Sequence, residues 1–260
     1  MIRRALFWTL WRLDTLGTML APRIVRWTGQ SAHPIHPKHF LDAPWQKWYL
    51  ANIEPGDTVL DAGCGNAMHT LACACRCHRA VGVDGDAGQL RIGVAQARDR
   101  SQTNLCLVLG DVDGLWPYEG GCFDKVILLD VLEHLDWREQ ALSEACRVLK
   151  PRGQLLVSVP QSTTRWKNMR RSVGLPAYAD PDHRVEYTRE EIVVLVSQSG
   201  FECQAIEPVV VDTWLAGLID LVGGLTPGLY RRLAEWKRQR ALRNPDESTG
   251  FRIVARKREQ

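Results

Sequence analysis

Apolar runs of strand length alternate with helix-like segments through the middle of the chain, from Thr58 to Val159. The runs lie at 58–61, 80–84, 105–109, 123–129 and 154–159, and helical periodicity fills 67–77, 87–98 and 138–149. Strands that alternate with helices predict a parallel sheet with helices on both faces. We therefore predict an α/β fold, a Rossmann-like doubly wound sheet that is mostly parallel. A strand at 201–211 and an antiparallel last strand at 251–255 would complete it.

The N-terminal segment predicts an amphipathic helix over residues 2–20. One stripe at three- and four-residue steps consists of Ile2, Leu6, Leu10, Leu13, Gly17 and Leu20. Trp8 and Trp11 flank this stripe beside arginines, a pattern that suits a helix on a membrane surface as well as a helix packed on its own domain. Charged residues interrupt the apolar run too early for a signal peptide or a membrane-spanning helix.

Changes in composition divide the chain further. The predicted domains are 1–44 (N-terminal helix and proline-rich linker), 45–211 with 251–260 (core domain) and 212–250 (helical insertion). The insertion and the N-terminal helix are both apolar beside basic residues, so 1–30 and 212–243 either cover an acceptor or dock on an anionic membrane. Residues 160–182 are long, polar and basic, which favours a lid for an anionic acceptor or a solvated loop.

Composition narrows the class of protein. The 260 residues are 45% apolar and 24% charged, as in globular proteins, and the net charge of +3 is too small to indicate a nucleic-acid partner. The eight cysteines are scattered. Without a secretory signal they indicate free thiols, so we expect a cytoplasmic protein, with the inner face of the membrane as the alternative if the apolar helices dock there. The oligomeric state is not predicted.

The candidate chemistry lies where the predicted strands end. Asp61 closes the first strand directly before Gly63 and Gly65, Asp84 closes the second, and Asp111 follows the third. Such strand ends meet at the switch point of a doubly wound sheet, where ligands bind. Asp84 is placed for ribose hydroxyls and Asp111 for the exocyclic amine of adenine. A carboxylate at the glycine turn disfavours a pyrophosphate and favours a cation, so an adenosine that carries a sulfonium fits better than NAD or FAD.

The same residues resemble a known family. Val59-Leu-Asp-Ala-Gly-Cys-Gly65 is similar to motif I of class I S-adenosylmethionine (SAM)-dependent methyltransferases, closest to the small-molecule and lipid group called type 11. The later motifs are matched by Val81-Gly-Val-Asp84, Gly110-Asp111, Phe123-Asp124, Glu133-His134-Leu135 and Leu149-Lys-Pro-Arg-Gly153. The resemblance covers about residues 45–205. It departs from the pattern at Ala67, where a third glycine is usual.

The resemblance implies a role for each matched residue. The implied SAM contacts are Gly63, Cys64 and Gly65 (methionyl part), Asp61 (amino group), Asp84 (ribose), Asp111 and Val112 (adenine), and Leu129 and Asp130 (methyl donor). Methyl transfer from a sulfonium depends mainly on in-line placement, although an oxygen or nitrogen acceptor can need a base. His134, His183 and Tyr187 are the candidates, with a structural role for His134 as the alternative.

We expect no metal site. His33, His36 and His39 lie in an extended segment where they need not converge, and Cys73 and Cys77 fall on a helix face that must pack against the sheet. Cys75 lies on the opposite side of that helix.

The expected function is SAM-dependent methyl transfer to an O, N or C atom of a small or lipid-like, anionic or neutral acceptor. The alternatives are a NAD or FAD oxidoreductase and a non-catalytic SAM-binding module. Base-modifying members that resemble this fold carry Asn-Pro-Pro-Tyr after strand four, and its absence here also disfavours nucleic acid.

Overall fold

The computed structural model describes residues 2–31, 34–40, 43, 45–178 and 180–259. Residue contacts divide the chain into two units. The helical unit comprises 1–46, 161–179 and 208–250, and the sheet unit comprises 47–160, 180–207 and 251–260. The predicted domains differ from these units chiefly at residues 161–179, which were predicted in the core domain and lie in the helical unit. The domain bounds stay a prediction.

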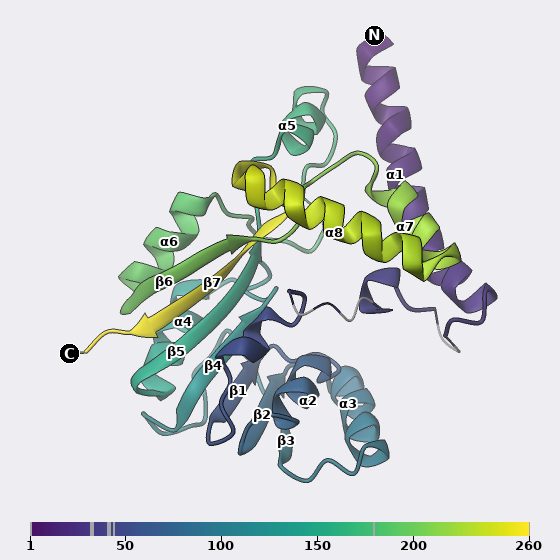
Figure 1. The fold of residues 1–260 in the computed structure, drawn as a ribbon. Helices are drawn as coiled ribbons and strands as arrows, with labels where there is room; N and C mark the ends of the chain where they lie inside the picture. Colours follow the sequence, from purple (N-terminus) through teal and green to yellow (C-terminus); the bar gives the residue numbers. More distant parts are fainter. Residues whose placement is uncertain (1, 32–33, 41–42, 44, 179, 260) are drawn as a thin grey trace. The chain divides into compact units, whose positions relative to one another are not determined.

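The sheet unit contains one seven-stranded sheet in the order β3-β2-β1-β4-β5-β7-β6. Its strands are β1 (Thr58–Ala62), β2 (Arg79–Asp84), β3 (Leu105–Leu109), β4 (Phe123–Leu129), β5 (Leu149–Pro160), β6 (Phe201–Pro208) and β7 (Gly250–Lys257). The first five strands are parallel, with Leu60 opposite both Val81 and Val126. The last strand is antiparallel, so the predicted fold class is confirmed (Figure 1). The chain order reverses at β1, between β2 and β4, which makes the end of β1 the switch point.

Helices of the sheet unit follow the predicted alternation. They are η2 (Trp48–Asn52), α2 (Met68–Ala74), α3 (Ala87–Asp99), α4 (Arg138–Val148) and α6 (Arg189–Gln198). The predicted capping box of α6 is present, because Thr188 Oγ1 accepts the Glu191 N–H at 3.2 Å and the Glu191 carboxylate accepts the Thr188 N–H at 2.7 Å. Leu60, Ile127 and Leu156 on the central strands are fully buried and form the core between helices and sheet.

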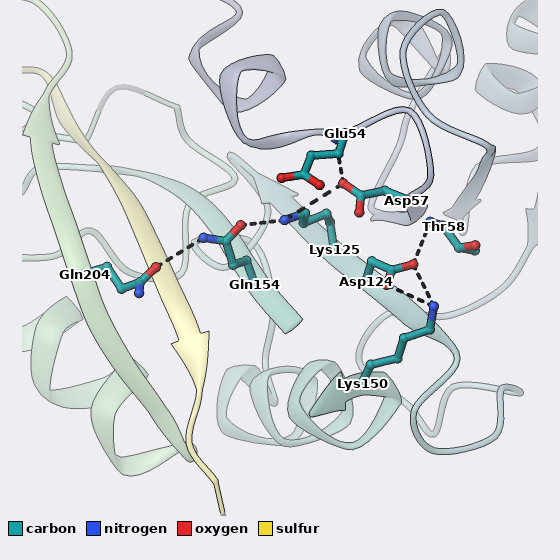
Figure 2. Close-up of polar contacts among 8 residues, drawn as sticks. All are labelled: Glu54, Asp57, Thr58, Asp124, Lys125, Lys150, Gln154 and Gln204. Atoms are coloured by element: carbon teal, nitrogen blue, oxygen red, sulfur yellow. Dashed lines mark hydrogen bonds and ion pairs between the residues drawn. The ribbon is translucent and has the colours of Figure 1, made fainter. Parts of the chain in front are cut away.

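The amino end of the sheet carries a network of paired polar groups (Figure 2). Asp124 accepts hydrogen bonds from Lys150 Nζ at 2.8 and 2.9 Å and from the Thr58 N–H at 2.9 Å. Lys125 Nζ donates to Gln154 at 2.6 Å. Burial alone would raise the pKa of Asp124, but these donors outweigh it and lower the pKa. The network ties β1, β4 and β5 together where the strands begin.

The helical unit is built on a close helix pair. Its elements are α1 (Ile2–Trp27), η1 (Pro37–Phe40), α5 (Arg165–Ser172), α7 (Ala216–Leu225), α8 (Pro227–Arg243) and η3 (Pro245–Glu247). A Cβ at Gly17 of α1 would lie 2.5 Å from the Gly217 carbonyl of α7, so the two backbones approach closely. The Gly217 N–H donates to Asp14 at 2.6 Å.

The pairing of α1 with α7 uses a different face of α1 from the predicted apolar stripe. Of the predicted stripe, Gly17 is buried, but Leu6, Leu13 and Leu20 are exposed. The packing face holds Ala21 and Val25 instead, because a close backbone approach admits only small side chains there. An apolar stripe is thereby left on the outer face of α1. No described helix is long and apolar enough to cross a bilayer.

The predicted lid contains the short helix α5 rather than an irregular loop. Thr164 caps it by accepting the Lys167 N–H at 3.1 Å. Lys167 is buried, with Nζ donating to the Gln161 carbonyl at 2.5 Å, and Arg165 pairs with Glu247 at 3.3 Å. Two basic side chains of the predicted anion site are therefore held by partners within the helical unit.

The linker prediction can be checked only in part. His33 and Pro44 lie outside the described residues, as does the side chain of His39. His36 Nε2 lies 3.2 Å from the Asp220 carboxylate of α7. His36 therefore contributes to packing of the helical unit.

Candidate functional site

The turn after β1 requires glycine. Gly63 has φ +80° and Gly65 has φ +51°, in the left-handed region. A Cβ at Gly63 would lie 2.6 Å from a methyl of Val131. The N–H groups of Gly63 and Cys64 both donate to the Val83 carbonyl, at 2.8 and 2.9 Å. The turn is thus fixed to β2, and its backbone can approach a ligand closely.

Asp84 connects this turn to the end of β2. One carboxylate oxygen accepts the Gly65 N–H at 2.6 Å, and the other accepts the Asp86 N–H at 2.8 Å. A carboxylate has about four lone-pair sites, so both oxygens retain acceptor capacity. Asp84 therefore orders the glycine turn and can still accept two hydroxyl groups, as a ribose would offer.

Asp61 is buried directly before the turn. Its side chain accepts a hydrogen bond from Thr70 Oγ1 at 2.6 Å. Burial, and to a smaller extent the nearby Asp84, raises the pKa of Asp61 to about 7, against the effect of the Thr70 hydrogen bond. None of the salt bridges among the described residues gives Asp61 a cation. A cationic ligand group at this position would compensate its charge.

The structure separates the two carboxylates after β3. Asp113 accepts the backbone N–H groups of Asp136 and Trp137 at 3.2 and 2.8 Å, so it supports the start of α4. Asp111 is exposed and accepts the Asp113 N–H at 2.9 Å. Val112 between them is buried. Asp113 is therefore structural, and Asp111 keeps an exposed side chain, so its predicted contact with adenine stays a prediction.

Asp130 occupies an unusual backbone conformation after β4. Its φ is +57°, which L-residues rarely adopt, and it follows the half-buried Leu129. Ser158 of β5 holds it in place, since its hydroxyl donates to the Asp130 carboxylate at 2.8 Å and its carbonyl accepts the Asp130 N–H at 3.0 Å. Strained non-glycine residues cluster at functional sites.

The turn after β4 and the segment before α6 bring two candidate bases together. The rings of His134 and His183 lie 4.9 Å apart between centroids, at 72°. His134 is exposed, whereas His183 is half-buried and places Nδ1 3.1 Å from the Glu186 carboxylate. The structure thus brings two of the three candidate bases together, and which imidazole acts stays a prediction.

Tyr187 and Cys64 lie deeper than a reacting group would. The Tyr187 hydroxyl donates to the Leu132 carbonyl at 3.4 Å within the core, and burial raises the pKa of its phenol. Burial likewise raises the pKa of the Cys64 thiol. Cys64 can line the turn with its backbone but is no nucleophile.

Glu133 is the residue that the sequence analysis missed. It is 1% exposed, and its Oε2 has no hydrogen-bond partner. Burial, followed by the charge of Asp130, raises the pKa of Glu133 to about 8. Its place between Asp130 and His134 was the only signal in the sequence. Among the described residues, Glu133, His134 and His183 form the group that could hold a metal ion.

The cysteine cluster does not belong to this site. Cys73 and Cys77 are buried in the core, and Cys75 is exposed beyond the end of α2. The helix stops at Ala74, three residues earlier than predicted.

Comparison with known proteins finds similarity to methyltransferases. A family model, Methyltransf_11, described as a methyltransferase domain, matches residues 60–157. A probable SAM-dependent methyltransferase of Mycolicibacterium smegmatis is 32% identical over 60% of this chain and 56% of its own length. A demethylmenaquinone methyltransferase of Symbiobacterium thermophilum is 31% identical over 43% of this chain and 48% of its own length. The chain thus spans about half the length of these curated relatives.

A solved structure shares the fold at low sequence identity. The [4+2]-cyclase SpnF superimposes with a TM-score of 0.61 at 21% identity, over 83% of this chain and 81% of that one. At this identity the likeness concerns the fold alone.

Proposed function

We propose that the chain is a class I SAM-dependent methyltransferase, with SAM as its cofactor, and that it transfers the methyl group of SAM to a small or lipid-like acceptor. The observation that carries the proposal is the turn from Gly63 to Gly65, with a buried carboxylate, Asp61, before it and Asp84 bonded to it at 2.6 Å. This arrangement suits a cationic adenosyl amino acid and would oppose a pyrophosphate.

In this proposal, residues at the ends of four strands, β1 to β4, would share the binding of SAM. Asp61 would hold the amino group, Asp84 the ribose hydroxyls, and Asp111 with the Val112 backbone the adenine. Leu129 and Asp130 would face the reacting end. SAM supplies a methyl group that its sulfonium already activates, so the protein's main contribution is orientation of the acceptor.

We propose His134 as the base for an oxygen or nitrogen acceptor. It is exposed in the turn that follows Asp130, and His183 packs against its ring. In the protein free of metal ions, its lone pair would take the acceptor proton as the methyl bond forms. His183 and Tyr187 remain the other candidates, and burial makes Tyr187 the weaker of the two.

A lipid-like acceptor is supported by features outside the SAM site. The Symbiobacterium relative is by name a demethylmenaquinone methyltransferase, which makes a quinone-like lipid a concrete candidate. The helical unit holds an apolar groove of about 400 Å³ between α7 and α8, lined among others by Leu218, Val222 and Trp236. The basic residues of α5 give an anionic acceptor less support, since Arg165 and Lys167 have internal partners.

We further propose that α1 docks on an anionic lipid surface. Its exposed apolar residues include Leu6, Leu13, Leu16 and Leu20. Arg12, whose guanidinium stacks on Trp8 at 4.4 Å, borders this stripe. An apolar stripe bordered by arginine and tryptophan suits the interface of an anionic bilayer.

Calorimetry with SAM tests the cofactor site. We expect Asp84→Ala to weaken SAM binding by about 100-fold or more, because charge-assisted hydrogen bonds contribute roughly 1.5–3 kcal/mol each. Asp99→Ala, an exposed carboxylate at the end of α3, is the matched control and should bind normally. Unchanged affinity in a folded Asp84→Ala protein would refute the ribose assignment.

Transfer of a tritiated methyl group into fractionated lysate tests the reaction itself. Label in the lipid or small-molecule fraction supports the proposal, and label in nucleic acid or protein contradicts it. SAM binding with no transfer to any fraction would instead identify a non-catalytic SAM-binding protein. A flavin or nicotinamide spectrum in the purified protein would favour an oxidoreductase.

Sedimentation with vesicles tests the membrane surface. Wild-type protein should bind vesicles that contain phosphatidylglycerol, and Leu13→Glu should reduce binding while leaving SAM affinity unchanged. Ile92→Glu changes an equally exposed apolar residue of α3 and should have no effect. If wild-type protein ignores anionic vesicles, the docking proposal fails.

A further inference from the structure

Three potential metal ligands converge beside the predicted methyl-transfer position. One ligand atom each of Glu133, His134 and His183 lies within 4.8 Å of the other two. Metal bonds of about 2.0–2.2 Å place two ligand atoms at most about 4.4 Å apart. Small side-chain rotations would therefore bring the three atoms to bonding distance of one ion.

The fold brings these residues together through the backbone. The Glu133 carbonyl accepts the N–H groups of Arg184 and Val185 at 2.7 and 3.4 Å. These bonds fasten the segment before α6 to the turn after β4, which sets His183 against His134. The convergence thus follows from main-chain contacts and does not depend on the imidazoles alone.

A second observation points independently to a ligand. Glu133 is 1% exposed, and its Oε2 has no hydrogen-bond partner within the described part of the chain. A buried carboxylate oxygen without a donor is costly, and native structures seldom leave one. A cation held between Glu133 and the two imidazoles would satisfy it.

The surroundings of His183 match those of metal-binding histidines. The buried Glu186 carboxylate lies 3.1 Å from Nδ1, which favours the tautomer with the proton on Nδ1 and the lone pair on Nε2. Metal-binding histidines commonly donate the other ring N–H to a carboxylate in this way.

We propose that Glu133, His134 and His183 form a binding site for one divalent transition-metal ion. Two imidazoles and a carboxylate suit zinc, manganese, iron or cobalt and disfavour magnesium and calcium, which prefer oxygen ligands. Three protein ligands leave coordination positions open, and the exposure of His134 gives the ion a route from solvent. The sequence analysis expected no metal because it weighed only the linker histidines and the cysteine cluster.

Titration of the chelator-treated, full-length protein with zinc chloride in a calorimeter tests the site. We expect one strong site per chain in the wild type, and no comparable heat with magnesium chloride. Glu133→Gln preserves the shape of the side chain. Glu133→Gln and His183→Ala should each weaken zinc binding by about 10-fold or more. His78→Ala removes an exposed histidine elsewhere in the sheet unit and should leave the affinity unchanged.

Cobalt(II) absorption identifies the ligands. Visible bands without thiolate charge-transfer absorption support the proposed site, whereas thiolate bands would assign the ion to cysteines and overturn it. The proposal is also overturned if the wild type does not bind zinc, or if folded Glu133→Gln and His183→Ala proteins bind zinc as tightly as the wild type does. SAM calorimetry without metal is measured separately, so failure of this site is distinguishable from failure of the SAM site.

Discussion

Carboxylates at the two ends of the sheet have opposite surroundings. At the amino end, Asp124 meets Lys150 and the Thr58 N–H, and its pKa is lowered (Figure 2). At the carboxyl end, Asp61 and Glu133 are more deeply buried and meet no cation among the described residues, and their pKa values are raised to about 7 and about 8. The same residue types are paired at one end and left uncompensated at the other.

The difference separates architecture from function. A carboxylate that meets its donors within the fold contributes to stability and needs nothing further. A carboxylate kept buried without a cation lowers stability unless a ligand compensates it, so perturbed groups mark candidate sites. By this criterion the carboxyl end has two candidate places for positive charge: Asp61, which we propose for the SAM amino group, and Glu133, which we propose for a metal ion.

The largest expected effect comes from closing the glycine turn. Gly63→Ala adds backbone strain at φ +80° and a clash with Val131, so we expect a loss of about 2–5 kcal/mol in unfolding free energy and of SAM binding. Gly65→Ala has the strain without the clash and should cost about 1–2 kcal/mol. Chemical denaturation measures both. Gly56→Ala, in the turn before β1 with open space around it, should change stability by less than about 1 kcal/mol. Equal losses in all three variants would contradict this account.

Neutralising one carboxylate at each end should give opposite results. Asp124→Asn loses an ion pair that is partly exposed, so we expect about 1 kcal/mol of destabilisation and normal SAM affinity. Asp61→Asn should lose SAM affinity by about 10-fold and gain about 1–3 kcal/mol of stability at pH 8. Because the pKa of Asp61 is raised on folding, that gain should be full above pH 7 and vanish below about pH 4. Chemical denaturation at pH 8 and pH 4 measures the stability of both variants, and calorimetry measures their SAM affinity. A loss of stability in Asp61→Asn at pH 8, or a loss of SAM affinity in Asp124→Asn, would contradict this expectation.

A smaller effect is expected from pH alone. With a pKa of about 7, Asp61 is half protonated near neutrality in the absence of ligand. A cationic amino group favours the carboxylate, so SAM affinity should fall as the pH drops below 7, by at most the roughly 10-fold that Asp61→Asn costs, and level off above pH 8. Calorimetry from pH 5.5 to 8.5 measures this slope. Asp61→Asn should abolish it, and a flat wild-type profile would show that Asp61 does not face the amino group.

Sequence periodicity predicted the sheet well because its strands are short, apolar and separated by glycine, proline and capping signals. It placed Asp111 just beyond the end of a strand for the same reason, and the role of Asp111 toward a ligand stays a prediction. It did not predict that Asp113 is structural and Asp111 is not. That difference depends on the hydrogen bonds between Asp113 and the backbone before α4, which form only in the fold. Of the two interpretations of the apolar stripe on α1, the structure does not favour packing on the domain, because the close backbone approach to α7 uses Gly17 and Ala21 while the leucines of the stripe are exposed.

Glu133 could not be found from the sequence for a related reason. Its lack of a hydrogen-bond partner appears only after the segment around His183 folds against the turn after β4, about 50 residues apart in sequence. The structural role of Lys167 was equally hidden, because basic side chains in a polar segment look solvated until their acceptors are known.

The smallest expected effect tests the remaining candidate base. The Tyr187 hydroxyl donates one long hydrogen bond, 3.4 Å to the Leu132 carbonyl, within the core. Tyr187→Phe should therefore cost about 0.5–1 kcal/mol of stability and leave kcat within about twofold, because its raised pKa keeps the phenol protonated. His134→Ala should lower kcat by about 100-fold for an oxygen or nitrogen acceptor while SAM affinity is unchanged. Methyl-transfer rates measured across pH distinguish Tyr187 from His134 as the base. If Tyr187→Phe lowers kcat at unchanged Tm and removes a limb of the pH profile, the base is Tyr187 in the core. The comparison between the two ends of the sheet must then include that buried phenol.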